Sequence, residues 1–110
     1  MVDETLAQLE TRIRHTSALN EAQKSELLQL LRALHAEIHA LVPTHAEQAE
    51  SITGFTQVST HEAMRQHRNP QLVELALKGL MSSAETFETS HPQLVHIVNS
   101  ISMLLANIGI

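Results

Sequence analysis

The chain has 110 residues, a formal net charge of −5 and no cysteine. This length fits one domain, and the lack of cysteine excludes disulfides, thiol catalysis and cysteine-ligated zinc. An acidic chain without a basic stripe is disfavoured as a nucleic-acid binder, and an aromatic content of 2% disfavours a large ligand pocket and a β-sheet.

The first 42 residues predict a helical hairpin. Apolar residues alternate in steps of four and three, which predicts a helix over about residues 4–16 with Asp3 as its N-cap. After a break, Asn20 and Gln23 have capping-box spacing, so a second helix is expected to run to about Val42. Its apolar stripe consists of Leu27, Leu31, Leu34, Ile38 and Leu41. The short break favours antiparallel packing of the two helices.

The segment 43–69 leaves two interpretations open. Pro43 either ends the second helix or opens a third. The four-three spacing continues through it, but most of the residues in the stripe are small and Gly54 interrupts it. The segment is therefore either a long helix with a narrow face for close packing or partly irregular. The helix is favoured, because a structureless stretch of this length is uncommon in a compact domain.

Residues 70–110 predict a pair of apolar helices. Asn69 followed by Pro70 marks a helix start, and that helix is expected to reach about Thr89, with Gly79 allowing close packing. Ser90 or His91 is expected to cap the last helix, which Pro92 opens and which ends near Asn107 and Gly109. The chain as a whole, residues 1–110, therefore predicts a single all-α domain: a helical bundle with coiled-coil-like packing, in which two or three further helices follow the hairpin.

The last 20 residues contain no Asp, Glu, Lys or Arg. A helix that is apolar nearly all round must be buried, either in the core of a monomer or at an interface between subunits. A terminal helix of a small monomer has few neighbours, so the interface is favoured and a homo-oligomer is predicted. The expected interface residues are Leu77, Leu80, Leu94, Val98, Ile101, Leu105 and Ile108. A peripheral or tail-anchored membrane protein is a weaker alternative, because polar residues interrupt the apolar run.

Two histidines provide a further alternative. His35 and His39 are four residues apart and therefore share a helix face, a spacing that can ligate a metal or respond to pH. The favoured interpretation is that both are partly exposed side chains beside the core. Ser90 and His91 are adjacent, but a nucleophile also needs a base oriented by a third group. The sequence therefore predicts no catalytic residue, no cofactor and no enzyme.

The C-terminal part resembles a known family. The segment from Phe87 to Leu94, Phe-Glu-Thr-Ser-His-Pro-Gln-Leu, and the closing residues 106–110, Ala-Asn-Ile-Gly-Ile, are similar to the tail of a family of short bacterial proteins classed as a domain of unknown function. The resemblance implies a bacterial, helical and cytoplasmic protein, and it brings no activity or site residue. The opening segment is not a secretory signal, which also predicts a cytoplasmic location. The expected role is a homo-oligomeric interaction or scaffold module, with an unidentified protein as a further partner.

Overall fold

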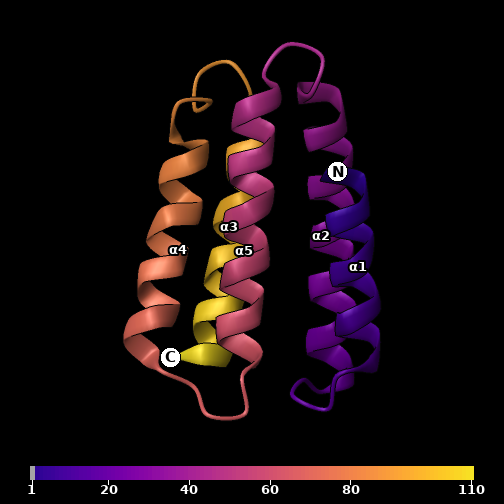
Figure 1. Ribbon diagram of the computed structural model, residues 1–110, viewed down its shortest axis with the longest axis vertical. Coiled ribbons are helices and arrows are strands. Elements are labelled where there is room, and N and C mark those ends of the chain that lie inside the picture. The colour runs from indigo at the N-terminus through magenta and orange to yellow at the C-terminus, as the bar shows by residue number, and fades with distance from the viewer. Residues whose placement is uncertain (1) are drawn as a thin grey trace.

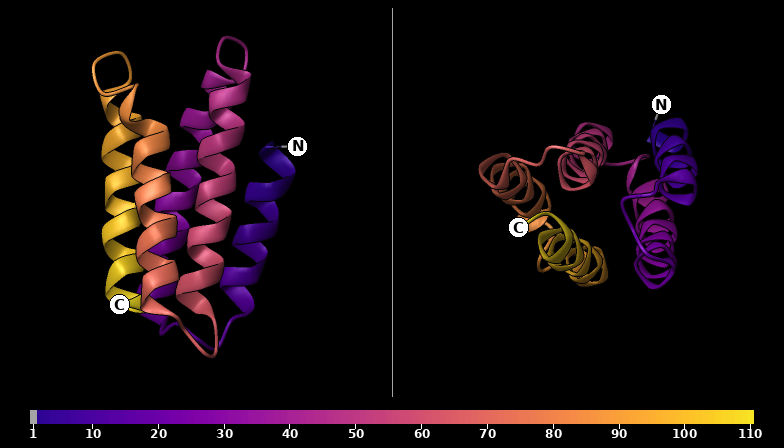
Figure 2. Two further views of the ribbon diagram at one scale, coloured as in Figure 1. Left: turned by 60° about the vertical axis from the view of Figure 1, so that its left-hand side comes forward. Right: turned by 90° about the horizontal axis from the view of Figure 1, so that it is seen from below.

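The computed structural model describes residues 2–110, which form five helices that run up and down along one long axis (Figure 1). The helices are α1 (Val2–His15), α2 (Glu21–Leu41), α3 (Ala46–Met64), α4 (Pro70–Glu85) and α5 (Pro92–Gly109). Seen end-on, they follow one another around the bundle in the order α1, α2, α5, α4 and α3 (Figure 2). The predicted all-α fold is confirmed.

The hairpin of α1 and α2 forms as predicted, with one correction at its start. The Asn20 side chain accepts a hydrogen bond from the Gln23 backbone at 2.8 Å, and the Gln23 side chain accepts one from the Asn20 backbone at 3.0 Å. This is the predicted capping box. The prediction that Asp3 is an N-cap is wrong: α1 already includes Val2, and Asp3 lies in its first turn. The Asp3 carboxylate instead bonds His35 on α2.

Helix α3 resolves the two interpretations of residues 43–69 in favour of a continuous helix over 46–64. Its buried face is narrow and rich in hydroxyl groups. Thr53, Thr56 and Thr60 are all buried, and each donates its hydroxyl to the carbonyl four residues earlier, at 2.7–2.8 Å. These local bonds satisfy the hydroxyls without a partner on another helix. The small side chains allow α3 to approach α1, α2, α4 and α5.

Helices α4 and α5 confirm the predicted pair, with a shorter α4. The Asn69 side chain accepts from the backbone of Gln71 at 3.0 Å and of Leu72 at 3.4 Å, as a capping residue should. The helix ends at Glu85 rather than near Thr89, because a turn over 86–90 follows. Phe87 in that turn is still buried, which explains why it continued the apolar pattern.

Helix α5 is the central element of the C-terminal half. It packs against α2, α3 and α4, and only a narrow stripe of it is exposed. At its last turn Gly109 lies so close to Val73 and Ala63 that an added Cβ would come within 3.0 Å and 3.1 Å of their atoms. Arg68, in the loop before α4, donates a hydrogen bond to the Ile108 carbonyl. Among the helices of residues 2–110, none combines the length and the apolar character needed to cross a membrane.

Candidate interaction face

The seven residues predicted to form a subunit interface are core residues of the single chain. Leu80, Leu94, Val98, Ile101 and Leu105 have no exposed surface, and Leu77 and Ile108 are at most 8% exposed. A side chain without exposed surface cannot contact a second copy while the chain stays folded. Within one folded chain, these seven side chains therefore offer almost no surface to a second copy. Five of them lie on α5, which three neighbouring helices cover within one chain, and Leu77 and Leu80 lie on the buried face of α4.

Several exposed apolar residues lie on the outer side of α3 and α4, and others include Met103 on α5 and Ile110. Large apolar side chains on these two antiparallel neighbours are 40–66% exposed: Phe55, Val58, Leu72 and Leu75. We call these four residues the apolar strip. Exposed apolar side chains that gather on one face are typical of protein interaction sites, whereas scattered ones are ordinary.

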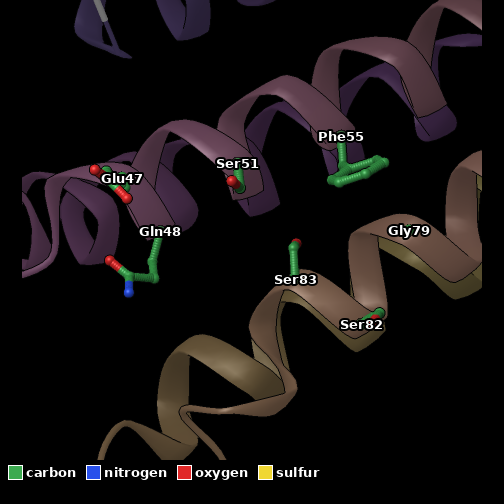
Figure 3. A pocket seen from close by; sticks show the side chains of 7 residues that line it. All are labelled: Glu47, Gln48, Ser51, Phe55, Gly79, Ser82 and Ser83. Atoms are coloured by element: carbon green, nitrogen blue, oxygen red, sulfur yellow. The ribbon is translucent and has the colours of Figure 1, made fainter.

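Gly79 sets the position of Phe55 within the strip. A Cβ at Gly79 would lie 2.3 Å from the Phe55 ring, so the missing side chain lets the ring lie directly on α4 (Figure 3). The ring thereby borders a polar groove of about 410 Å³ between the two helices. The groove is lined beyond Phe55 and Gly79 by Glu47, Gln48, Ser51, Ser82 and Ser83. The seam between α3 and α4 is thus apolar towards Val58 and Leu75 and polar towards Ser51 and Ser83.

The charges beside the strip come in opposite pairs. On α4, the Lys78 ammonium lies 3.5 Å from the Glu74 carboxylate, and directly after α3 the Arg65 guanidinium lies 2.8 Å from the Glu62 carboxylate. The charged residues next to the strip are therefore locally balanced, although the whole chain has a net charge of −5. A balanced surface can approach a like surface without strong repulsion.

His35 and His39 share a face as predicted, and the structure adds an acidic partner. The His35 Nε2 lies 2.6 Å from the Asp3 Oδ1, and the His39 Nδ1 lies 3.7 Å from the same oxygen. The hydrogen bond from His35 lowers the pKa of Asp3, which is mostly exposed. The two histidines on α2 therefore stabilise the packing of α1 against α2 through their contacts with Asp3. Within residues 2–110 no group of three or more His, Cys, Asp or Glu side chains is placed to hold a metal ion.

Sequence reasoning missed the strip because it followed the buried stripes. Val58 and Leu75 lie off the four-three pattern of their helices, and this is the signal that could have identified them. A large apolar residue on the polar side of an amphipathic helix either continues the core or faces a partner. Deciding between these needs the position of the neighbouring helix, which the pattern of one segment does not contain.

The chain belongs to a family of unknown function. The family described as Domain of unknown function (DUF4404) matches residues 27–110. This range includes most of α2, all of α3, α4 and α5, and therefore the whole apolar strip. The resemblance predicted from the C-terminal segments is confirmed. No curated protein and no solved structure matches the chain.

Proposed function

We propose that the chain is a non-enzymatic helical module that forms a homodimer through the apolar strip on α3 and α4. The observation that carries this proposal is the exposure of the strip: Leu75 is 66% exposed and Val58 is 48% exposed, on two neighbouring helices. Covering such side chains on association contributes roughly 25 cal/mol for each Å² of apolar surface removed from water.

Charge complementarity favours a second copy as the partner. Glu74 and Lys78 lie two residues before and two residues after Ala76 on α4. In a twofold dimer with two antiparallel α4 helices crossing near Ala76, Glu74 of each copy would therefore face Lys78 of the other. Leu75 would lie at the centre of the contact between these reciprocal ion pairs. An interface that presents the same patch from both copies is the commonest arrangement of homo-oligomers.

The cytoplasm is the proposed location and bacteria the proposed source. The lack of cysteine fits a reducing compartment. The resemblance of the C-terminal segments to short bacterial proteins supports the source. We also propose that the dimer binds a further protein, because a scaffold module acts by bringing other molecules together.

A pair of exposed substitutions tests the interface without disturbing the core. Val58→Glu together with Leu75→Glu adds two negative charges to the strip of each copy, so the dimer is expected to dissociate and the native mass to fall to 12.2 kDa. Light scattering after size exclusion measures the mass, and circular dichroism checks that the helices remain. Met103→Glu is the matched control, because Met103 is 69% exposed but lies on α5, away from the strip.

The arrangement of the two α4 helices has its own test. Lys78→Glu should weaken the dimer, because each copy would then place a negative charge opposite Glu74 of the other. Adding Glu74→Lys to that variant restores opposite charges across the twofold axis and should recover the dimer. If the double variant is as weak as the single variant, the antiparallel α4 contact is wrong. If Met103→Glu dissociates the dimer and the strip variant does not, the strip itself is not the interface.

A further inference from the structure

Two histidines and a phenylalanine pack together at one end of the bundle. The loop between α2 and α3 and the loop between α4 and α5 lie at this same end (Figure 1). The ring centres of His45 and His91 lie 6.2 Å apart, and each lies 5.3 Å from the ring centre of Phe87. Phe87 is only 3% exposed, so it fixes both imidazole rings against the end of the core.

The two histidines occupy equivalent positions in the fold. His45 is the N-cap residue of α3 and His91 is the N-cap residue of α5, with φ and ψ of −139° and 56° in the first case and −138° and 64° in the second. Neither side chain makes a capping hydrogen bond. Each instead meets the hydroxyl of the preceding residue: the Thr44 Oγ1 lies 2.8 Å from the His45 Nδ1, and the Ser90 Oγ lies 2.9 Å from the His91 Nδ1.

The Thr44 hydroxyl lies within hydrogen-bonding distance of both the Leu41 carbonyl and the His45 Nδ1. The Thr44 hydroxyl donates to the Leu41 carbonyl at 3.4 Å. A hydroxyl has one proton, so when that proton goes to the Leu41 carbonyl, the hydroxyl oxygen accepts from the His45 Nδ1–H. The His45 Nε2 then carries the free lone pair. A hydrogen bond donated by one ring nitrogen is what holds most metal-bound histidines in place while the other nitrogen binds the metal.

We propose that His45 and His91 bind a divalent transition metal ion through their Nε2 atoms. Imidazole nitrogen suits zinc, nickel and copper. A metal about 2.1 Å from each nitrogen at a tetrahedral angle holds two imidazole ring centres about 5.2 Å apart. The two ring centres lie 6.2 Å apart in this structure, so they would move about 1 Å closer on binding. Water occupies the remaining coordination positions. The metal links the loops before α3 and α5, and so joins the two halves of the bundle end.

This site differs from the pair on α2. The His35 Nε2 already bonds the Asp3 carboxylate at 2.6 Å, so that nitrogen has no free lone pair to offer. The nitrogens of His45 and His91 that face the hydroxyls are the Nδ1 atoms, which leaves both Nε2 atoms for a metal. The metal proposal is also independent of the dimer, because the two histidines lie at the bundle end and the apolar strip runs along its side.

The test adds nickel chloride to the chain without a histidine tag. The melting temperature is expected to rise by on the order of 10 °C at a hundredfold excess over the dissociation constant. Calorimetry should give one nickel per chain. His45→Asn and His91→Asn each remove the ligand but supply a good N-cap, so both variants should fold and lose the rise. The double variant His35→Ala with His39→Ala is the matched control and should keep it.

Copper gives a second measurement that does not depend on stability. The electron paramagnetic resonance spectrum of the chain with one equivalent of Cu²⁺ should show coupling to two imidazole nitrogens, and one coupling should disappear in each asparagine variant. The proposal is overturned if the melting temperature does not respond to nickel, or if the asparagine variants respond as the parent does. It is also overturned if only the His35→Ala and His39→Ala variant loses the response.

Discussion

Asp3 shows how a single side chain escapes prediction from local sequence. Its position before an apolar stripe indicated an N-cap, and that prediction was wrong because the carboxylate bonds His35, which is 32 residues away in the chain. Asn20 was predicted correctly because its partner, Gln23, is three residues away. At the scale of one residue, sequence predicts the contacts that close within one helical turn and misses those that need a second helix.

The contact of Asp3 predicts a dependence of stability on pH. Its pKa is lowered in the folded chain by the hydrogen bond from His35. A lowered pKa stabilises the fold above the unfolded-state value, about 3.9, and this contribution is lost as the pH falls through the folded-state pKa. Asp3→Asn should therefore be less stable than the parent at pH 6, with the difference shrinking towards pH 2. Urea unfolding at several pH values measures it, and a constant difference would contradict the assignment.

For Ser59, we expect that removing the side-chain hydroxyl raises the stability of the fold. Its side chain is fully buried on α3, and within residues 2–110 its hydroxyl has no hydrogen-bond partner. A buried hydroxyl without a partner costs about 1–3 kcal/mol of desolvation, so Ser59→Ala should raise the free energy of unfolding by about 1 kcal/mol. Thr56→Ala is the comparison, because the Thr56 hydroxyl bonds the Ile52 carbonyl at 2.7 Å. That change should destabilise, and a loss of stability from Ser59→Ala would contradict this reasoning.

At the scale of the helix, the apolar pattern predicted which face of each element is buried. The stripe of α2 from Leu27 to Leu41 is fully buried, and α3 is continuous despite its small residues. The end of α4 was predicted four residues too late, because Phe87 is buried from a turn and continues the helical spacing by chance. Burial alone therefore does not distinguish a last helical turn from a turn that folds back on the core.

Helix α5 yields a prediction at the same scale. Ile101 has no exposed surface, whereas Met103, two residues later, is 69% exposed. Ile101→Ala should lower the free energy of unfolding by about 2–5 kcal/mol, because it leaves a cavity among α2, α3 and α4. Met103→Ala should change it by no more than about 0.5 kcal/mol. Chemical denaturation compares the two, and equal effects would mean that α5 is not packed as a core helix.

At the scale of the whole molecule, the uncharged C-terminal helix was the most misleading feature of the sequence. A helix without charge on any side indicated an interface, on the assumption that a small monomer cannot surround it. The bundle surrounds it with three helices and leaves exposed only a stripe that includes His96, Asn99, Met103 and Asn107. The order of helices around the bundle decides this, and no local pattern encodes that order.

The same arrangement explains why the proposed interface lies on α3 and α4 and not on α5. Once α5 is inside, the apolar residues left exposed along a shared seam are those of the apolar strip. Sequence contained these residues but not their proximity. The family match includes the strip, so other members of the family are suitable for testing whether the strip has the same role.

The native mass of the unaltered chain tests the proposed dimer most directly. Light scattering after size exclusion, with detection by refractive index because the chain has no Trp or Tyr, gives this mass over a range of loading concentrations. A dimer predicts twice the chain mass of 12.2 kDa, falling towards the single value only on dilution. A mass of 12.2 kDa at every concentration would contradict the proposal, and the apolar strip would then not join two copies of this chain.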